Sequence, residues 1–508
     1  MVIQSFLPST RGDIMKRSQH KNLALAVLLT VGMLLFTPYK CNTISDKHAN
    51  WSMFMHDLQN TGYSPSAAPD TPHLLWIFDT EQRLFGSPIV YNGTLYQVGR
   101  GSLFALDAET GGTIWSSELP VIGSTPFVTG ESLYVGTCNG IAALNSETGE
   151  LIWQVQLADF ECDPWNDDLS NFIASSPIMT NTRVIMCTHR NISASYGYPN
   201  PEGINRIVCL DSETGTLLWQ HPLDDRAGYS PAFIDGRVFI NSTQLRVLDD
   251  ETGQQLWSYT DAKGLYDTSP VIDHNAVVTI STDEGSVYQV DITAQELLWK
   301  CDLDSHVIST PAVHNNRVIV VTIEETIYAL DENTGSVLWK REVHVESNFS
   351  AHDVLKNATA SFNSSPAIAD NKIYVGLRSG LFLCLELDTG EILWQYETEG
   401  SIVASPAVAD EKVFIASTDG KVYCFGIDPE TYFQKAEQYD KQGDTDRARE
   451  FYKRAKDYYE SQGNSEMVKK CEDKLRGRIS LWIIVIVALC MIICAAVTYW
   501  KMHKPNKC

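Results

Sequence analysis

One short pattern recurs along the chain and constrains its fold more than any other feature. An acidic residue or Asn is followed eight positions later by Trp, and in most copies Thr-Gly lies between them. The most complete copy, ALDAETGGTIW, runs from Ala105 to Trp115. The other copies end at Trp153, Trp219, Trp257, Trp299, Trp339 and Trp394. Because the same spacing is kept in all seven copies, the sequence predicts a repeat protein.

The motif predicts a tight turn between two β-strands. The carboxylate of Asp107 can accept hydrogen bonds from backbone N–H groups of the turn, and Gly111 supplies a positive φ. Trp115 then places a large flat side chain on the second strand, where it can pack against a neighbouring sheet. We therefore interpret Asp107, Gly111 and the recurring Trp residues as a structural lock between adjacent sheets.

A Ser/Thr-Pro pair precedes an apolar run in every repeat. The pairs are Ser87-Pro88, Thr125-Pro126, Ser176-Pro177, Ser230-Pro231, Ser269-Pro270, Thr310-Pro311, Ser365-Pro366 and Ser405-Pro406. Proline is tolerated at the start of a strand, before the hydrogen-bond ladder begins. After the first pair, strands are expected at 88–91, 95–98 and 103–106, followed by the Trp strand. Four antiparallel strands in about 38–42 residues are typical of a propeller blade.

Eight Ser/Thr-Pro pairs open eight blades, but only seven Trp strands follow them. The missing strand is expected upstream, at Leu74 to Phe78, which contains Trp76. It should pair with the third strand of the last unit and close the ring, since an open ring leaves two unpaired sheet edges. The fold class predicted for residues 49–427 is therefore all-β, an eight-bladed propeller closed by an N-terminal strand.

Three segments break the repeat period, at 158–173, 189–205 and 344–362. Antiparallel strands alternate in direction, so all three segments should lie on one face of the ring, opposite the motif turns. Loops on a rigid scaffold commonly carry function, and we expect this face to bind a partner. The candidate contact residues are Phe160, Trp165, Phe172, Tyr196, Tyr198 and Phe349.

The ends of the chain indicate export and membrane attachment. Residues 1–48 contain a basic flank and an apolar run, 23–36, which is typical of a signal peptide or signal anchor. Ile479 to Trp500 carries no charge and is long enough to cross a bilayer as a helix. A basic tail, 501–508, follows and is expected in the cytoplasm. The predicted location is the cell membrane, with the propeller on the extracytoplasmic side and both ends of the propeller leaving from the motif-turn face.

Residues 428–478 show a helical pattern, with a break at Gly443-Asp444. A third helix is expected from Ser465 to Leu475. The apolar stripe consists of Ala436, Tyr439, Ala448, Tyr452 and Ala455.

Charge, sequons and cysteines each add an expectation about the partners, glycosylation and thiol chemistry of the chain. The formal net charge of −24 disfavours nucleic acid and anionic membrane surfaces. Asn-x-Ser/Thr sequons mark glycosylation candidates in an exported chain, namely Asn191, Asn241, Asn348, Asn357 and Asn363. Cys187, Cys209, Cys384 and Cys424 lie in apolar strands and are expected to be buried thiols. Cys162 could pair with Cys187 or Cys138.

The repeat A-x-D-x-x-T-G-x-x-x-W, complete at Ala105 to Trp115, resembles the tryptophan-docking motif of quinoprotein-type eight-bladed propellers with PQQ-like repeats. The lead-in from Trp51 to Ser64 is similar to that of exported PQQ-repeat proteins. The chain is also similar to the outer-membrane-assembly propeller lipoproteins, which implies a non-catalytic scaffold. The stripe in 428–478 resembles a single tetratricopeptide repeat.

Two classes of function follow from the quinoprotein resemblance. The first is a PQQ-dependent dehydrogenase, whose family members hold PQQ near two adjacent, disulfide-bonded cysteines, with a calcium ion and a catalytic Asp. This chain has no adjacent cysteines. The second, which we favour, is a scaffold that binds a protein or a surface glycan, with no catalytic residue and no cofactor. A hydrolase or lyase in the central channel is a third class, but no nucleophile constellation supports it.

One acidic loop is a weak candidate for calcium. Asp159, Glu161 and Asp163 alternate as in a calcium-binding loop, but Pro164 replaces the glycine that such a loop needs. The alternative is a solvated acidic loop, which we favour.

Overall fold

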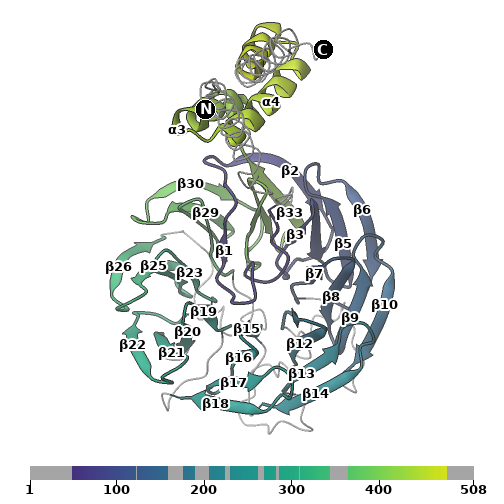
Figure 1. Cartoon of the computed structure of the whole chain (residues 1–508), viewed down its shortest axis with the longest axis vertical. Coiled ribbons are helices and arrows are strands. Elements are labelled where there is room, and N and C mark those ends of the chain that lie inside the picture. The colour runs from purple at the N-terminus through teal and green to yellow at the C-terminus, as the bar shows by residue number, and fades with distance from the viewer. Residues whose placement is uncertain are drawn as a thin grey trace, which may run out of the picture. The chain divides into compact units, whose positions relative to one another are not determined.

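The strands of the propeller lie in a ring of eight sheets. The computed structural model describes residues 49–121, 123–157, 175–188, 205–223, 229–260, 268–281, 285–307, 309–343 and 364–476. The strands of these residues form eight separate sheets, which Figure 1 shows arranged around a common centre. The predicted eight-bladed propeller is confirmed.

The first blade illustrates how each sheet is built. Its strands, from the centre outward, are β3 (Ile89–Tyr91), β4 (Thr94–Val98), β5 (Ser102–Asp107) and β6 (Thr113–Glu118). They pair in sequence order as an antiparallel meander. The inner strands are largely buried, because sheets pack against them on both faces, whereas β6 is mostly exposed. The expected strands agree with these bounds to within one or two residues.

The next six blades repeat this arrangement. Blade two contains β7 (Phe127–Thr129), β8 (Ser132–Thr137), β9 (Gly140–Asn145) and β10 (Leu151–Gln156). Blade three contains β11 (Ile178–Thr180), β12 (Arg183–Thr188), β13 (Arg206–Asp211) and β14 (Leu217–Pro222). Blade four contains β15 (Ala232–Ile234), β16 (Arg237–Asn241), β17 (Leu245–Asp249) and β18 (Gln255–Tyr259). Blade five contains β19 (Val271–Asp273), β20 (Ala276–Ser281), β21 (Ser286–Asp291) and β22 (Leu297–Asp302). Blade six contains β23 (Ala312–His314), β24 (Arg317–Val321), β25 (Thr326–Asp331) and β26 (Val337–Glu342). Blade seven contains β27 (Ala367–Ala369), β28 (Lys372–Gly376), β29 (Leu381–Glu386) and β30 (Ile392–Glu397).

The eighth blade joins the two ends of the propeller. It contains β31 (Ala407–Ala409), β32 (Lys412–Ala416) and β33 (Lys421–Gly426), and its outer strand is β2 (His73–Asp79). β2 pairs antiparallel with β33, with Trp76 opposite Cys424. The predicted closing strand at Leu74 to Phe78 is confirmed.

The motif locks most blades to the next one. The Asp107 carboxylate accepts hydrogen bonds from the N–H groups of Glu109 and Thr110, at 3.1 and 2.8 Å. The indole of Trp115 donates to the carbonyl of Ser146 at 2.9 Å and lies against Gly149 of blade two. A Cβ at Gly149 would lie 2.6 Å from the indole ring, so this position needs glycine for close approach as well as for its φ of +74°. The same ring-on-glycine contact joins Trp76 to Gly111, Trp153 to Gly215, Trp219 to Gly253, Trp299 to Gly335 and Trp339 to Gly390.

The Ser/Thr-Pro pairs form a closed circle of hydrogen bonds. In each pair the backbone N–H of the Ser or Thr donates to the side-chain hydroxyl of the equivalent residue in the following blade, at 2.9–3.3 Å. The last bond, from Ser405 to Ser87, returns to blade one at 2.9 Å. In each pair the Pro directly precedes the inner strand, as expected. The hydroxyl of the Ser or Thr before it accepts the hydrogen bond that joins this blade to the preceding one.

Strand direction defines two faces of the ring. The turn face carries the turns between the first and second strands, such as 92–93, and the motif turns, such as 107–112. The junction face carries the links between blades and between second and third strands. The described ends of the three period-breaking segments, such as Leu157 and Val343, lie on the junction face because the preceding strands run toward it.

A helical segment follows β33. The 3-10 helix η3 (Pro429–Thr431) leads into α3 (Tyr432–Gln442) and α4 (Thr445–Ser461), and residues 465–476 are also helical. Gly443 ends α3 with a φ of +81°, and the Asp444 side chain caps α4 by accepting from Arg447 N–H. The predicted stripe packs between the helices, with Ala436, Ala448, Tyr452 and Ala455 fully buried. The expected small helical segment is therefore confirmed.

Residues 1–48 and 477–508 lie outside the described residues, and so do the expected signal segment and the expected span at Ile479 to Trp500. Among the helices that are described, none has the length and apolar character needed to cross a bilayer.

Candidate functional site

The lead-in before β2 fills the centre of the ring. Backbone carbonyls of six lead-in residues accept hydrogen bonds from the middle residue of the inner strand in six blades, at 2.6–2.9 Å. The pairs, lead-in carbonyl first, are Trp51 with Val90, Ser52 with Val128, Leu58 with Phe233, Gln59 with Ile272, Thr61 with Val313 and Gly62 with Ile368. β1 (Tyr63–Ser64) then adds a parallel strand inside β27. Figure 1 shows this segment looping into the middle of the ring.

Two side chains hold the lead-in in its central position. Asn60 is fully buried, and its amide donates to the carbonyls of Pro231 at 3.2 Å and Pro270 at 3.0 Å, in neighbouring blades. The Asp57 carboxylate accepts from Thr61, through both its N–H and its hydroxyl, and so stabilises the local turn. The sequence alone did not predict this central position. A signal was present, since Met53, Met55 and Asn60 lie in a Gly-containing stretch that has no strand period.

The contact residues predicted for the junction face cannot be placed. Phe160, Trp165, Phe172, Tyr196, Tyr198 and Phe349 lie outside the described residues, and so do Asp159, Glu161 and Asp163 of the acidic loop. The expectations for a partner surface and for calcium there stay predictions.

Of the five glycosylation candidates, only Asn241 lies among the described residues. It ends β16 with 2% of its surface exposed, and its amide donates to the carbonyl of Thr268 at 2.8 Å. This position does not suit a glycan in the folded chain, because the amide nitrogen that would carry the sugar is enclosed by blade five. Asn191, Asn348, Asn357 and Asn363 stay predictions.

The cysteines among the described residues fall into two groups, free thiols and one disulfide-bonded residue. Cys187, Cys209, Cys384 and Cys424 are buried free thiols, as expected, and burial raises the pKa of Cys187 to about 12. The alternative pairing of Cys162 with Cys187 is therefore wrong. Cys138 is disulfide-bonded, and its partner is not among the described residues.

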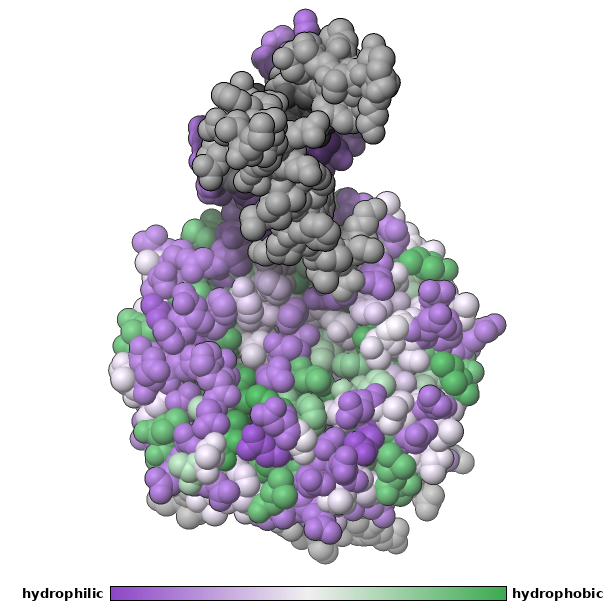
Figure 2. Space-filling model, in the orientation of Figure 1, coloured by the Kyte–Doolittle hydropathy of each residue, from purple (hydrophilic) through white to green (hydrophobic). Residues whose placement is uncertain are grey.

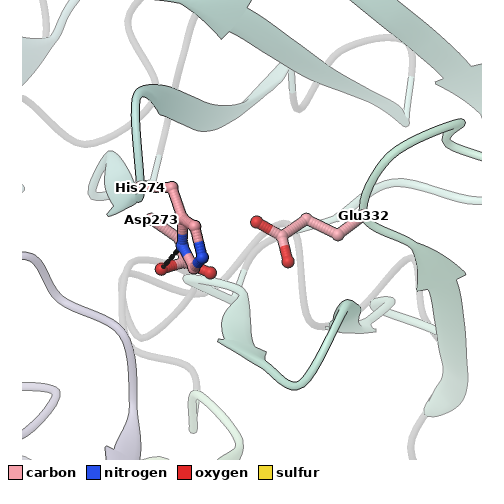
Figure 3. A group of neighbouring side chains, drawn as sticks. All are labelled: Asp273, His274 and Glu332. Atoms are coloured by element: carbon pink, nitrogen blue, oxygen red, sulfur yellow. Dashed lines mark hydrogen bonds and ion pairs between the residues drawn. The ribbon is translucent and has the colours of Figure 1, made fainter.

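A cluster of Asp273, His274 and Glu332 lies on the turn face, and the sequence analysis missed it. Each offers one potential metal-ligating atom, and these atoms lie within 4.8 Å of one another. Figure 3 shows Glu332 pointing toward the other two from the next blade. Burial, and then the Asp273 carboxylate, raise the pKa of Glu332 to about 7. The hydrogen bond between His274 Nδ1 and Asp273 Oδ1, at 2.7 Å, raises the pKa of His274. No short motif signals this cluster, since the ring brings together residues 58 positions apart.

The outer strands expose apolar side chains around the ring. Aliphatic residues next to the docked Trp are 41–53% exposed, although their chemistry favours burial. Figure 2 shows hydrophobic patches separated by hydrophilic residues along the edge of the ring. The residues are Ile77, Ile114, Leu151, Ile152, Leu217, Leu218, Leu256, Leu297, Leu298, Val337, Leu338, Ile392 and Leu393. We call these residues the aliphatic belt.

Solved structures share this fold. BamB from Moraxella catarrhalis aligns at 18% identity over 70% of this chain and 97% of its own, with a TM-score of 0.54. Quinohemoprotein alcohol dehydrogenase from Comamonas testosteroni aligns at 15% identity over 74% and 80%, with a TM-score of 0.58. The computationally designed protein Ika8 aligns at 18% identity over 70% and 100%, with a TM-score of 0.53. At such low identity these likenesses concern the fold alone. No curated protein matches the chain in sequence.

A family model covers nearly the whole propeller. It matches residues 66–194, 198–273, 245–362 and 349–431, which together exceed half of the chain. Its description is "Outer membrane protein assembly factor BamB". The chain therefore belongs to this BamB-like family of PQQ-repeat propellers.

Proposed function

We propose that the chain is a non-catalytic scaffold of the cell envelope that binds protein partners through the junction face of its propeller. Membership of the BamB-like family supports a role in envelope assembly.

The observation that carries the proposal is that both ends of the propeller pack on the turn face. Ala49 donates its N–H to Asp410 at 2.6 Å, in the turn between β31 and β32. The helical segment contacts the same face, since Lys435 pairs with Asp70 at 2.6 Å and Arg454 pairs with Glu411. The turn face is thus partly covered by the chain's own segments. The junction face is the side that these contacts leave for a partner.

The lead-in supports binding at a surface rather than chemistry in a through-channel. Its carbonyls join six inner strands across the middle of the ring, so the inner strands form a rigid, filled hub. Rigid scaffolds with variable loops on one face are well suited to partner recognition. We therefore favour a protein partner over a surface glycan.

An extracytoplasmic location is part of the proposal. The disulfide at Cys138 supports it, since disulfides persist in oxidising compartments. The predicted signal segment and the predicted span at Ile479 to Trp500 are consistent with a propeller on the extracytoplasmic side of the membrane. Protease added to intact cells should digest the propeller and spare the basic tail 501–508; a propeller that is digested only after the cells are lysed would contradict this location.

Cross-linking of the chain in native membranes, read by mass spectrometry, tests the binding face. We expect links to partner proteins from 158–173, 189–205 and 344–362. Links confined to the turn face would reject the proposed face, and links confined to the aliphatic belt would move the interface to the outer edge of the ring. Loss of cross-links after glycosidase treatment alone would favour a glycan.

A PQQ-dependent dehydrogenase is the alternative, because quinohemoprotein dehydrogenases are as similar to this chain in fold as BamB is. The residues present do not fit the quinone site that the resemblance implies. The chain has no adjacent cysteines, and the lead-in occupies the centre of the ring. Oxidation of alcohols or sugars by the purified chain supplied with PQQ and Ca²⁺ would overturn the scaffold proposal.

A further inference from the structure

Glu332 and Asp250 occupy the same place in two different blades. Each follows the first residue of its motif turn, and its carbonyl accepts the indole N–H of the preceding blade's Trp, Trp299 at 2.7 Å and Trp219 at 2.9 Å. Both residues are more than nine-tenths buried, with 8% and 5% of their surface exposed. A carboxylate that stays ionised while buried at this place needs a compensating positive charge.

Asp250 has such a partner in the preceding blade. Arg183, the first residue of β12, approaches the Asp250 carboxylate at 3.4 Å. The first residue of the second strand is also basic at three further boundaries among the described residues, where it pairs with a more exposed acid that directly follows the residue accepting the Trp indole. These ion pairs are Arg317 with Asp388 at 3.2 Å, Lys372 with Asp70 at 3.0 Å and Lys412 with Glu109 at 2.7 Å.

The boundary between blades five and six departs from this pattern. The first residue of β20, which matches Arg183, is Ala276. Among the described residues, no Lys or Arg forms an ion pair with Glu332. Instead, the turn of blade five presents Asp273 and His274, whose ligating atoms lie within 4.8 Å of that of Glu332. Two carboxylates and an imidazole converge at this boundary (Figure 3), whereas four other boundaries have a basic residue that forms an ion pair across the boundary.

We propose that a zinc-class divalent metal ion binds Asp273, His274 and Glu332 and supplies the positive charge that Ala276 does not. One imidazole with two carboxylates is a ligand set that Zn²⁺ accepts. Ca²⁺ needs six to eight oxygen ligands and does not favour an imidazole. Tetrahedral ligands about 2.1 Å from zinc lie roughly 3.4 Å apart, so the side chains must close by only about an ångström.

The His274 side chain is 87% exposed, so the ion is reachable from solvent and a water molecule can complete its coordination. The ion would clamp the turn after β19 to the motif turn of blade six. It would act as a cross-blade staple on the turn face, independent of any partner on the junction face.

Metal uptake by the full-length chain tests the proposal. The chain is stripped with a chelator, dialysed against Zn²⁺ alone near pH 7.5, and analysed for bound metal and for melting temperature. We expect one zinc per chain at this site and a higher melting temperature. His274→Ala and Glu332→Gln should each weaken zinc affinity by at least about 10–100-fold, the loss seen even when an outer partner of a ligand is removed.

Two further variants provide the controls. Ala276→Arg introduces the basic residue that Arg183 supplies in blade three. This variant should take up no zinc, and without zinc it should melt at about the temperature of the zinc-loaded wild type. Asp388→Asn removes an acid from another boundary and should leave uptake unchanged. The proposal is overturned if the wild-type chain takes up no more zinc than Glu332→Gln, or if His274→Ala binds zinc as the wild type does. Because His274 is an exposed turn residue, its replacement keeps the test valid even where Glu332→Gln does not fold.

Discussion

The indole N–H of Trp394 donates to the carbonyl of Pro69 at 3.4 Å, across 325 positions of the sequence. The Tyr374 hydroxyl donates to the same carbonyl at 3.0 Å. In the earlier blades a motif turn receives the Trp of the preceding blade, but β2 has no motif turn before it. Pro69 takes that part, so the lock that joins blade seven to blade eight uses the residues just before the closing strand.

Gly215→Ala should destabilise the chain more than Gly236→Ala. Both glycines have a positive φ, +71° and +74°, so each substitution costs about 1–2 kcal/mol of backbone strain. At Gly215 the new Cβ would also lie 2.8 Å from the Trp153 ring, whereas at Gly236 its nearest neighbour is 3.5 Å away. We expect an additional loss of about 1–3 kcal/mol at Gly215, measured by guanidinium unfolding. Equal losses would show that the indole moves aside freely.

Ser230→Ala should break one link of the hydroxyl circle. It removes the acceptor of the Ser176 N–H, at 3.2 Å, and leaves that buried donor unpaired. The expected cost is about 1–3 kcal/mol of unfolding free energy. Ser116→Ala, on an exposed strand position, is the control and should change stability by less than about 0.5 kcal/mol. A neutral Ser230→Ala variant would mean that water replaces the hydroxyl.

Asn60→Gly should weaken the central position of the lead-in. Glycine tolerates the φ of +58° at this residue, so the change isolates the two lost amide hydrogen bonds and the vacated volume. We expect a loss of about 2–3 kcal/mol. Asn92→Gly, at an exposed turn with a φ of +50°, is the matched control and should be close to neutral. Limited proteolysis should cut the lead-in sooner in Asn60→Gly than in Asn92→Gly.

Acid should loosen the contact between the helical segment and the ring. Burial alone raises the pKa of Asp70, but hydrogen bonds from Lys435 and Lys372 outweigh it and hold the pKa below its usual value. A lowered folded-state pKa stabilises the contact above the unfolded value of about 3.9, and this stabilisation is lost as the pH falls through the folded-state pKa. The protection of the α3 amides, measured by hydrogen exchange relative to the intrinsic rate at each pH, should therefore fall below about pH 4 in the wild type. Asp70→Asn should exchange rapidly already at pH 7, and unchanged exchange in that variant would contradict the assignment.

The sequence predicted the blades, their order and the closing strand because the residues of the motif lie close together in the chain. Asp107, Gly111 and Trp115 fall within one turn and one strand, so their spacing is visible in the sequence, although Trp115 docks on the next blade. Trp76 was identified as the missing outer strand by counting alone. The hydroxyl circle was missed although every Ser and Thr in it had been noted, because seven of its bonds join residues 38–55 positions apart and the closing bond joins residues 318 positions apart.

The central lead-in and the metal-ligating cluster were missed for the same physical reason. Asn60 finds its hydrogen-bond partners only when blades four and five are both in place. Glu332 approaches Asp273 and His274 only when the turn after β19 is in place. Such relationships arise from closure of the ring, which periodicity does not encode. The burial of Asn241 was also not visible in the sequence, because a sequon records residue type and not the strand that encloses it.

Closure also sets an order on folding. The lead-in and β2 are the first parts of the propeller to be synthesised, yet their partners lie in six blades and in β33, whose synthesis comes last. Contacts of such high sequence separation form slowly. Until synthesis has passed Gly426, the apolar strand β2 cannot pair with β33. Several backbone carbonyls of the lead-in also lack their hydrogen-bond donors until the blades that supply them have been made. The nascent chain is therefore most exposed to aggregation at its oldest end, and a chaperone that holds residues 51–79 would be of most use to it.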